Sequence, residues 1–165
     1  MKHLKLYEQF DFDENDPFGE EIEYIKPTFL YWLKKNYPDE NIWNKITEIG
    51  CPRSQLTSLE GIENLVSLEK LYCWGNQLTS LEGIENLVNL EQLFCFNSQL
   101  TSLEGIENLV NLELLSCSYN QLISLEGIEK LVNLKTLYCD HNQFTIEYKN
   151  YLRDYCKKRK IILNI

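Results

Sequence analysis

Positively charged side chains are scarce in this 165-residue chain, which carries 16 Lys and Arg against 25 Asp and Glu for a net charge of −9. Such a surface repels phosphate backbones and anionic lipid headgroups, so neither nucleic acid nor a membrane is expected as a partner. The chain also lacks an apolar run of the about 18 residues that a membrane span needs. It starts without the apolar stretch of a secretory signal and has no Asn-x-Ser/Thr sequence. We therefore expect an intracellular, cytoplasmic protein.

Histidine is rarer still, with two residues, and the residue patterns of common enzyme sites are missing. There is no glycine-rich phosphate loop, no zinc-ligand spacing and no nucleophile elbow. Cys139, Asp140 and His141 are the residue types of a cysteine hydrolase, but alternation along a strand would turn Cys139 inward and Asp140 outward. We therefore expect no enzyme, no cofactor and no bound metal.

Internal repetition is what the chain has in abundance. Residues 78–99 and 100–121 are identical at 17 of 22 positions, and residues 56–77 and 122–143 follow the same pattern. A degenerate half-repeat that begins at Ile46 precedes these four repeats. A fixed period of this length is the signature of a solenoid, in which each coil buries its apolar residues against the next.

The pattern within each repeat predicts the shape of one coil. It reads Leu-x-x-Leu-x-Cys-x-x-Asn-x-Leu, and its centre alternates with period 2, which predicts a short strand with Leu and Cys facing inward. The remainder spaces apolar residues three apart, as in Leu78, Leu81 and Ile84, and this spacing favours tight 3₁₀ turns. The expected fold is a right-handed α/β solenoid with a parallel β-sheet on its concave side and 3₁₀-type turns on its convex side.

These repeats resemble those of leucine-rich repeat proteins, in the 22-residue subclass seen in internalins and related intracellular regulators, over residues 46–143. The cysteine at a strand position usually held by leucine, the phrase NQLTSLEGIE and the near-identity of the repeats are more specifically similar to the multicopy repeat proteins of giant DNA viruses. For a viral protein the location implied is the host cytoplasm. Because leucine-rich repeats serve many functions, the function has to be argued from individual residues.

Three parts of the chain are predicted: an acidic segment with a helical cap, the solenoid, and a C-terminal cap helix with a final strand, at residues 1–45, 46–143 and 144–165. The first cap is expected to hold a helix followed by a shorter one that buries Ile42 and Trp43 against the first coil. The second cap helix is expected to begin at Thr145. Caps of this kind close the open ends of a solenoid core.

Five cysteines recur every 22 residues and should form one inward-facing row: Cys51, Cys73, Cys95, Cys117 and Cys139. Neighbouring parallel strands lie about 4.8 Å apart, but their Cβ atoms point the same way, which disfavours a disulfide. A straight row also fails the tetrahedral geometry that zinc requires. We therefore expect small, buried, free thiols.

Two polar rows accompany the cysteines. Asn76, Asn120 and Asn142 are expected to turn inward after each strand and satisfy backbone groups of adjacent coils, whereas Ser54 and Ser98 interrupt this row. Eight glutamates repeat on the outer turns: Glu60, Glu63, Glu82, Glu85, Glu104, Glu107, Glu126 and Glu129. We interpret them as a solvated face that maintains solubility, with a site for a divalent cation or a basic partner as the alternative.

The positions that differ between repeats are the informative ones for function. Residues 78–99 and 100–121 differ at five positions, four of which are predicted to face the concave, solvent side of the sheet or to follow the strand directly. Across all repeats these positions hold large aromatic and polar residues. We call the following nine the aromatic face: Tyr72, Trp74, Phe94, Phe96, Asn97, Tyr119, Tyr138, Asp140 and His141.

Clustered aromatic side chains on an exposed sheet are typical of protein interfaces. We therefore predict a non-catalytic module that binds a protein or peptide partner through the aromatic face. Two alternatives remain open. In the first, the face is self-complementary and forms a homodimer. In the second, its rings pack on one another or are covered by the ends of the chain, including residues 1–22.

Overall fold

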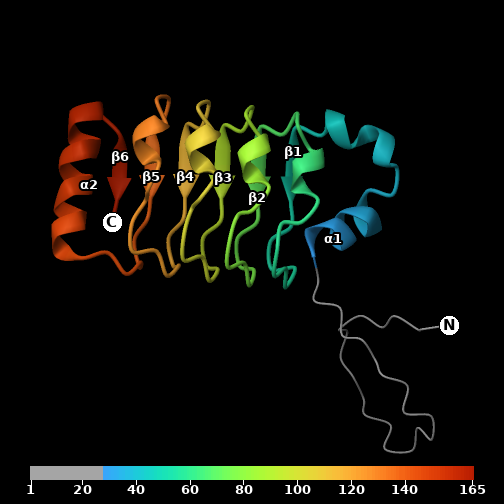
Figure 1. Cartoon of the computed structure of the whole chain (residues 1–165), viewed down its shortest axis with the longest axis horizontal. Coiled ribbons are helices and arrows are strands. Elements are labelled where there is room, and N and C mark those ends of the chain that lie inside the picture. The colour runs from blue at the N-terminus through green and yellow to red at the C-terminus, as the bar shows by residue number, and fades with distance from the viewer. Residues whose placement is uncertain (1–27) are drawn as a thin grey trace, which may run out of the picture.

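The computed structural model describes residues 28–165, and the expectations for residues 1–27 lie outside this part of the chain. Six short strands form one parallel sheet in chain order (Figure 1): β1 (Glu48–Gly50), β2 (Lys70–Tyr72), β3 (Gln92–Phe94), β4 (Leu114–Ser116), β5 (Thr136–Tyr138) and β6 (Ile162–Asn164). From β1 to β5 each residue pairs with the one 22 positions later, so equivalent repeat positions lie side by side. The predicted parallel sheet is confirmed.

The predicted 3₁₀ turns are also confirmed, at η2 (Ile62–Asn64), η3 (Ile84–Asn86), η4 (Ile106–Asn108) and η5 (Ile128–Lys130). A glycine with positive φ precedes each turn. At Gly105, φ is 96° and an added Cβ would lie 3.2 Å from Cγ2 of Ile84 in the preceding coil. This position therefore requires glycine for both its backbone conformation and the closeness of the next coil.

Part of the predicted acidic face has a structural role that the sequence interpretation missed. Glu63, Glu85 and Glu107 each accept a hydrogen bond from the backbone N–H of the glycine two residues earlier, at 2.9–3.0 Å. These carboxylates close the turn, since they satisfy an N–H that the left-handed glycine leaves without a backbone partner. The other predicted row, at Glu60, Glu82, Glu104 and Glu126, is exposed as expected.

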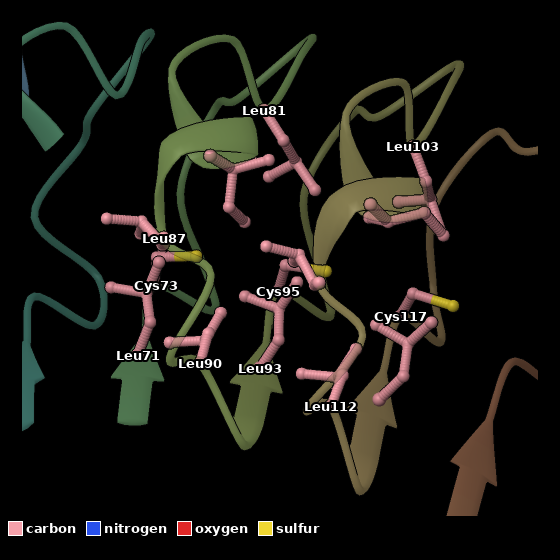
Figure 2. Close-up of a cluster of buried hydrophobic side chains, with 14 of the residues drawn as sticks. Leu71, Cys73, Leu81, Leu87, Leu90, Leu93, Cys95, Leu103, Leu112 and Cys117 are labelled. Carbon is pink, nitrogen blue, oxygen red and sulfur yellow. The ribbon is translucent and has the colours of Figure 1, made fainter. Parts of the chain in front are cut away.

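The core is a continuous stack of Leu, Ile and Cys side chains between the sheet and the turns. Figure 2 shows Leu93 and Cys95 beside the equivalent residues of the neighbouring coils, with the sulfur atoms in a row. Both residues have no exposed surface. All six cysteines are free and buried, as predicted for the five in the row. Burial raises the pKa of the Cys51 and Cys139 thiols to about 12 and those of the three cysteines between them well above the ordinary value.

We expect these thiols to resist alkylation in the folded protein, because the reactive species is the thiolate and burial suppresses it. Mass spectrometry after iodoacetamide treatment at about pH 8 should find Cys95 unmodified in the native chain and labelled in urea. Rapid native labelling of Cys95 would contradict the packing.

Because the ordinary thiol pKa of 9.0 rises on folding, the folded state also binds more protons than the unfolded chain between about pH 9 and 12, so stability should fall as pH rises through that window.

Helices lie at both ends of the sheet (Figure 1), at α1 (Phe29–Asn36), η1 (Glu40–Lys45) and α2 (Ile146–Arg159). Side chains of Thr28 and Thr145 cap α1 and α2 by accepting hydrogen bonds from backbone N–H groups. Trp43 is 5% exposed, but Ile42 is 40% exposed, so its predicted burial is wrong. The segment forms a 3₁₀ helix, in which the adjacent side chain points about 120° away from Trp43.

The C-terminal helix α2 packs on the last repeat, residues 122–143, through polar contacts as well as through its buried Leu152 and Cys156. The Tyr148 hydroxyl accepts a hydrogen bond from the Leu125 N–H at 2.7 Å. Arg159 donates to three backbone carbonyl oxygens of that repeat, at 3.0, 3.2 and 3.5 Å. Within residues 28–165, no helix has the length and apolar character needed to cross a membrane.

Candidate functional site

The strands of the repeats turn alternate side chains to opposite sides of the sheet. On β2, Leu71 is buried in the core while Tyr72 is partly exposed on the other side, and beyond the strand Cys73 and Trp74 repeat this alternation. The same pattern holds after β3, where Phe94 and Phe96 are partly exposed and Cys95 is buried. Sheet geometry thus brings these four rings onto one surface, as the aromatic face requires.

The rings of β2 and β3 form two stacks. Tyr72 and Phe94 have ring centroids 4.8 Å apart and planes 12° apart, and Trp74 and Phe96 lie 5.2 Å and 5° apart. The guanidinium of Arg53 lies 5.1 Å from the Trp74 ring and covers its outer face. Strand spacing of about 4.8 Å is close to an aromatic stacking distance, so in-register rings stack without further adjustment.

Both stacks end at β3, because the next coil places serines where the earlier ones have rings. Ser116 and Ser118 are 8% and 7% exposed, and they occupy the positions of Phe94 and Phe96. The following coil has Tyr138, which is 38% exposed, and Asp140 at the corresponding positions. The aromatic face therefore has two halves: stacked rings over β2 and β3, and a polar half over β4 and β5.

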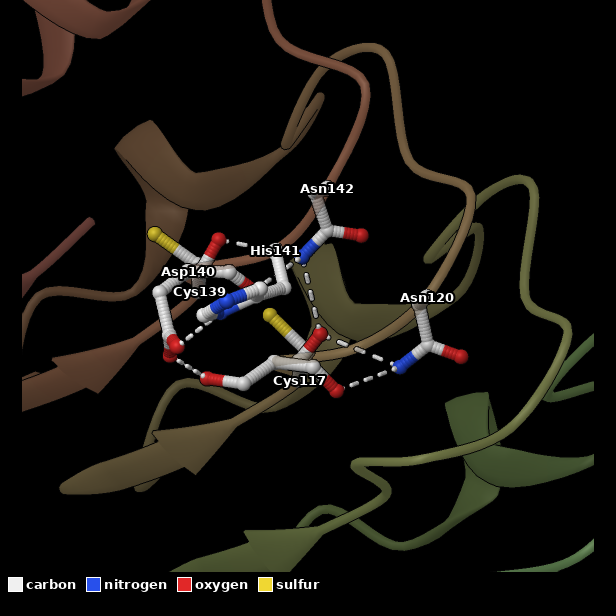
Figure 3. A network of polar contacts seen from close by, with 7 residues as sticks. Cys117, Asn120, Cys139, Asp140, His141 and Asn142 are labelled. Carbon is white, nitrogen blue, oxygen red and sulfur yellow. Dashed lines mark hydrogen bonds and ion pairs between the residues drawn. The ribbon is translucent and has the colours of Figure 1, made fainter.

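Asp140 is the centre of a hydrogen-bonded cluster in the polar half (Figure 3). Its carboxylate accepts a hydrogen bond from the Ser118 hydroxyl, and its other oxygen lies 2.6 Å from Nδ1 of His141. The His141 ring in turn stacks on Tyr119, with centroids 4.1 Å apart. Desolvation raises the pKa of Asp140, but the hydrogen bonds from Ser118 and His141 outweigh it and lower the pKa, so the carboxylate is ionised at neutral pH.

Residues just beyond the strands complete the face. Asn97, Tyr119 and His141 occupy one repeat position and all have φ between 53° and 55°. This left-handed conformation turns the chain at the end of each strand and leaves all three side chains exposed. The structure therefore places all nine residues of the aromatic face on the same side of the sheet, over four consecutive coils.

The catalytic group considered and rejected at Cys139, and the cation site considered as the alternative for the outer glutamates, do not assemble within residues 28–165. Cys139 is fully buried, whereas the neighbouring Asp140 and His141 lie on the opposite side, so the three do not form a catalytic group. On the turn side, open grooves lie between successive coils, one of them of about 590 Å³ and lined in part by Glu82, Glu85, Glu104 and Glu107. Among residues 28–165, however, no group of three or more His, Cys, Asp or Glu is placed to hold a metal ion.

One exposed row was missed in the sequence. The valine after each 3₁₀ turn is 44–64% exposed, and the row comprises Val66, Val88, Val110 and Val132. An asparagine of the next coil donates its side-chain N–H to the carbonyl of each of the first three valines, at 2.9–3.0 Å. The signal was present, since each of these valines falls one residue after a leucine and breaks the spacing of three. This valine is identical in every repeat, whereas the residues of the aromatic face differ between repeats.

Comparison with known proteins places this geometry in a family. The family model for leucine-rich repeats, in its two-copy form, matches residues 66–108 and 110–150. No curated protein matches the chain. The structure is similar to an internalin, InlF, from Listeria monocytogenes, with a TM-score of 0.60 and 22% identity over 66% of this chain and 31% of that one.

Two further structures share more of the sequence. A leucine-rich repeat protein of Leptospira interrogans has a TM-score of 0.62 and 33% identity, over 67% of this chain and 29% of that one. The functional domain of InlJ from Listeria monocytogenes, which includes a cysteine ladder, has a TM-score of 0.60 and 33% identity, over 64% of this chain and 23% of that one. The chain thus spans only 23–31% of the length of these structures. With its 22-residue coils, its parallel sheet and its own row of buried cysteines, the chain belongs to the leucine-rich repeat family.

Proposed function

We propose that the chain is a non-catalytic interaction module that binds a protein or peptide partner through the aromatic face. Leucine-rich repeat domains are in general protein-interaction modules. The observation that carries the proposal is the contrast between the repeats. The scaffold positions of two coils are identical, while the positions that differ include Phe94, Phe96, Asn97 and Tyr119 on the aromatic face.

The chemistry of the face supports a partner of modest size. Stacked aromatic rings provide a rigid apolar surface that loses little conformational entropy on binding, and such residues dominate interface energetics. Four coils at about 4.8 Å spacing span only about 15–20 Å, which suits a peptide or one edge of a domain. The helices α1 and α2 lie at the two ends of the sheet (Figure 1), and the four stacked rings of the aromatic face stay partly exposed within residues 28–165.

A peptide selection tests the proposal directly. A displayed library of random linear dodecapeptides is selected on the full chain, and the selected peptides are titrated into isotopically labelled protein. We expect resonances of Tyr72, Phe94 and Tyr138 to shift, while those of the convex turns stay in place. Shifts confined to the glutamate or valine rows, or a failure to select any binder, would overturn the proposal.

Light scattering across protein concentration separates partner binding from self-association. The proposal expects a monomer in the absence of a partner. A dimer that dissociates when a selected peptide is added would instead assign the aromatic face to contacts between two copies, since a two-fold interface uses the same patch on both chains.

A further inference from the structure

The stack of Tyr72 and Phe94 has one ring side that nothing covers. Phe94 covers the side of Tyr72 that points toward β3, with ring centroids 4.8 Å apart. On the opposite side, the residue of β1 that pairs with Tyr72 is Gly50, which has no side chain. Within residues 28–165, no second ring stacks on Tyr72 and no cation lies over it. The side of Tyr72 that points toward β1 is therefore open above Gly50.

Neither the backbone nor the packing of residues 28–165 requires a glycine at this position. Gly50 is exposed and lies outside the left-handed region of φ that favours glycine. An added Cβ would lie 3.8 Å from Cδ of Pro52 and 3.9 Å from Cβ of Tyr72, which are ordinary contact distances. Each of the other strands carries a side chain at the equivalent position: Tyr72, Phe94, Ser116, Tyr138 and Asn164. Because glycine weakens a strand, a glycine that the fold does not need points to the close approach of another molecule.

The space above Gly50 has the dimensions of one more ring in the stack. Neighbouring strands lie about 4.8 Å apart, which is also the separation of the Tyr72 and Phe94 rings. A flat group held against the open side of Tyr72 therefore stands over Gly50, where a side chain would obstruct it. Arg53 shows that a planar group fits on this side of β2, since its guanidinium lies over Trp74, the ring two residues after Tyr72.

The charges beside this space favour a neutral ligand. Two residues before Gly50, Glu48 pairs with Lys70 at 3.3 Å, and three residues after it Arg53 lies over Trp74. A partner cation would have to lie between these two cations, which repel it. A neutral aromatic ring meets no such cost, and it gains both buried apolar area and a stacked neighbour.

We propose that the aromatic face contains a stacking subsite for one aromatic side chain of the partner, which lies against the open side of Tyr72 above Gly50 and becomes the third ring of the stack. This inference rests on the proposed function, because a partner segment must first bind the aromatic face. It adds one requirement to that function: the partner carries a phenylalanine, tyrosine or tryptophan that reaches β1.

The test uses dodecapeptides selected on the full chain, which should have an aromatic residue in common. Replacing this residue by alanine should weaken binding to the wild-type protein about 30-fold. Replacing it by cyclohexylalanine, which has the size of phenylalanine but is not flat and has no π-system, should weaken binding about fivefold. Equal binding of all three peptides would overturn the subsite.

Gly50→Tyr fills the subsite with a ring of the chain itself. It should lower the affinity for the aromatic peptide about 30-fold and leave the affinity for the alanine peptide at the wild-type value. The melting temperature should rise, because a strand residue replaces glycine and a third ring joins the stack. Val88→Tyr is the matched control, since it adds the same ring at an exposed position outside the aromatic face and should change neither affinity.

The possible results separate the subsite from the proposed function. Selected peptides without an aromatic residue, or an equal effect of Gly50→Tyr on both peptides, would overturn the subsite and leave the proposed function intact. If Gly50→Tyr shifts resonances of residues 1–22 in the absence of peptide, the space belongs to that segment of the chain and the subsite is again overturned. A selection without any binders would overturn both.

Discussion

Asn120→Ala is expected to lower the free energy of unfolding by about 3 kcal/mol, because it leaves several buried backbone groups without a hydrogen-bond partner. The Asn120 amide oxygen accepts from the Leu100 N–H at 3.0 Å, and its nitrogen donates to the carbonyls of Cys95 and Cys117 at 3.1 and 3.0 Å. These bonds join two coils, and Asn120 is 8% exposed, so water cannot readily replace them. Urea unfolding curves of the variant and the wild type measure this loss of free energy, and the two proteins should have equal m-values.

The coil before Asn120 supplies the control for this prediction. Ser98 occupies the asparagine position there, and its hydroxyl is buried without a hydrogen-bond partner in the described part of the chain. Ser98→Asn should therefore raise the free energy of unfolding by about 1 kcal/mol, since it completes the row with an amide. Ser98→Ala should change it little. If Asn120→Ala unfolds at the wild-type urea concentration, the amide row does not hold the coils together.

The repeat explains why much of the fold was predictable. A side chain that recurs every 22 residues meets its own counterpart in the next coil, so the register of β2 with β3 follows once the solenoid is inferred. The inward direction of Asn76 followed in the same way, and its amide does join adjacent coils, through Leu56 and Cys51. The 22-residue period therefore predicts the contacts that are repeated from one coil to the next.

The contacts that escaped prediction depend on local geometry or on two different residues. Glu85 accepts from Gly83 only because the glycine has a positive φ, which the spacing of apolar residues does not report. The cluster at Asp140 requires a serine in one coil and a histidine beside the aspartate in the next. Because this combination of serine, aspartate and histidine does not recur in the other repeats, the period does not predict it. The candidate site is therefore predictable as a set of exposed positions, but its hydrogen bonds and stacking are not.

The double variant Trp74→Ala/Phe96→Ala is expected to lower affinity for a selected peptide about 100-fold or more while the chain stays folded. Aromatic residues at the centre of an interface each contribute about 2 kcal/mol or more to binding. Their contribution to folding is smaller, because both rings are partly exposed and a stacked pair stabilises by about 0.5–1.5 kcal/mol beyond its buried area. Calorimetric titration and thermal unfolding measure the two effects on the same sample.

The valine row provides the matched control for this variant. Val88→Ala/Val110→Ala also removes exposed apolar surface from two neighbouring coils, but at positions outside the aromatic face, so affinity should stay at the wild-type value. Unchanged affinity together with a lower melting temperature in Trp74→Ala/Phe96→Ala would show that the rings only pack on one another. Since one substitution pair lies where the repeats differ and the other where they are identical, the comparison also tests whether divergence between coils marks the binding surface.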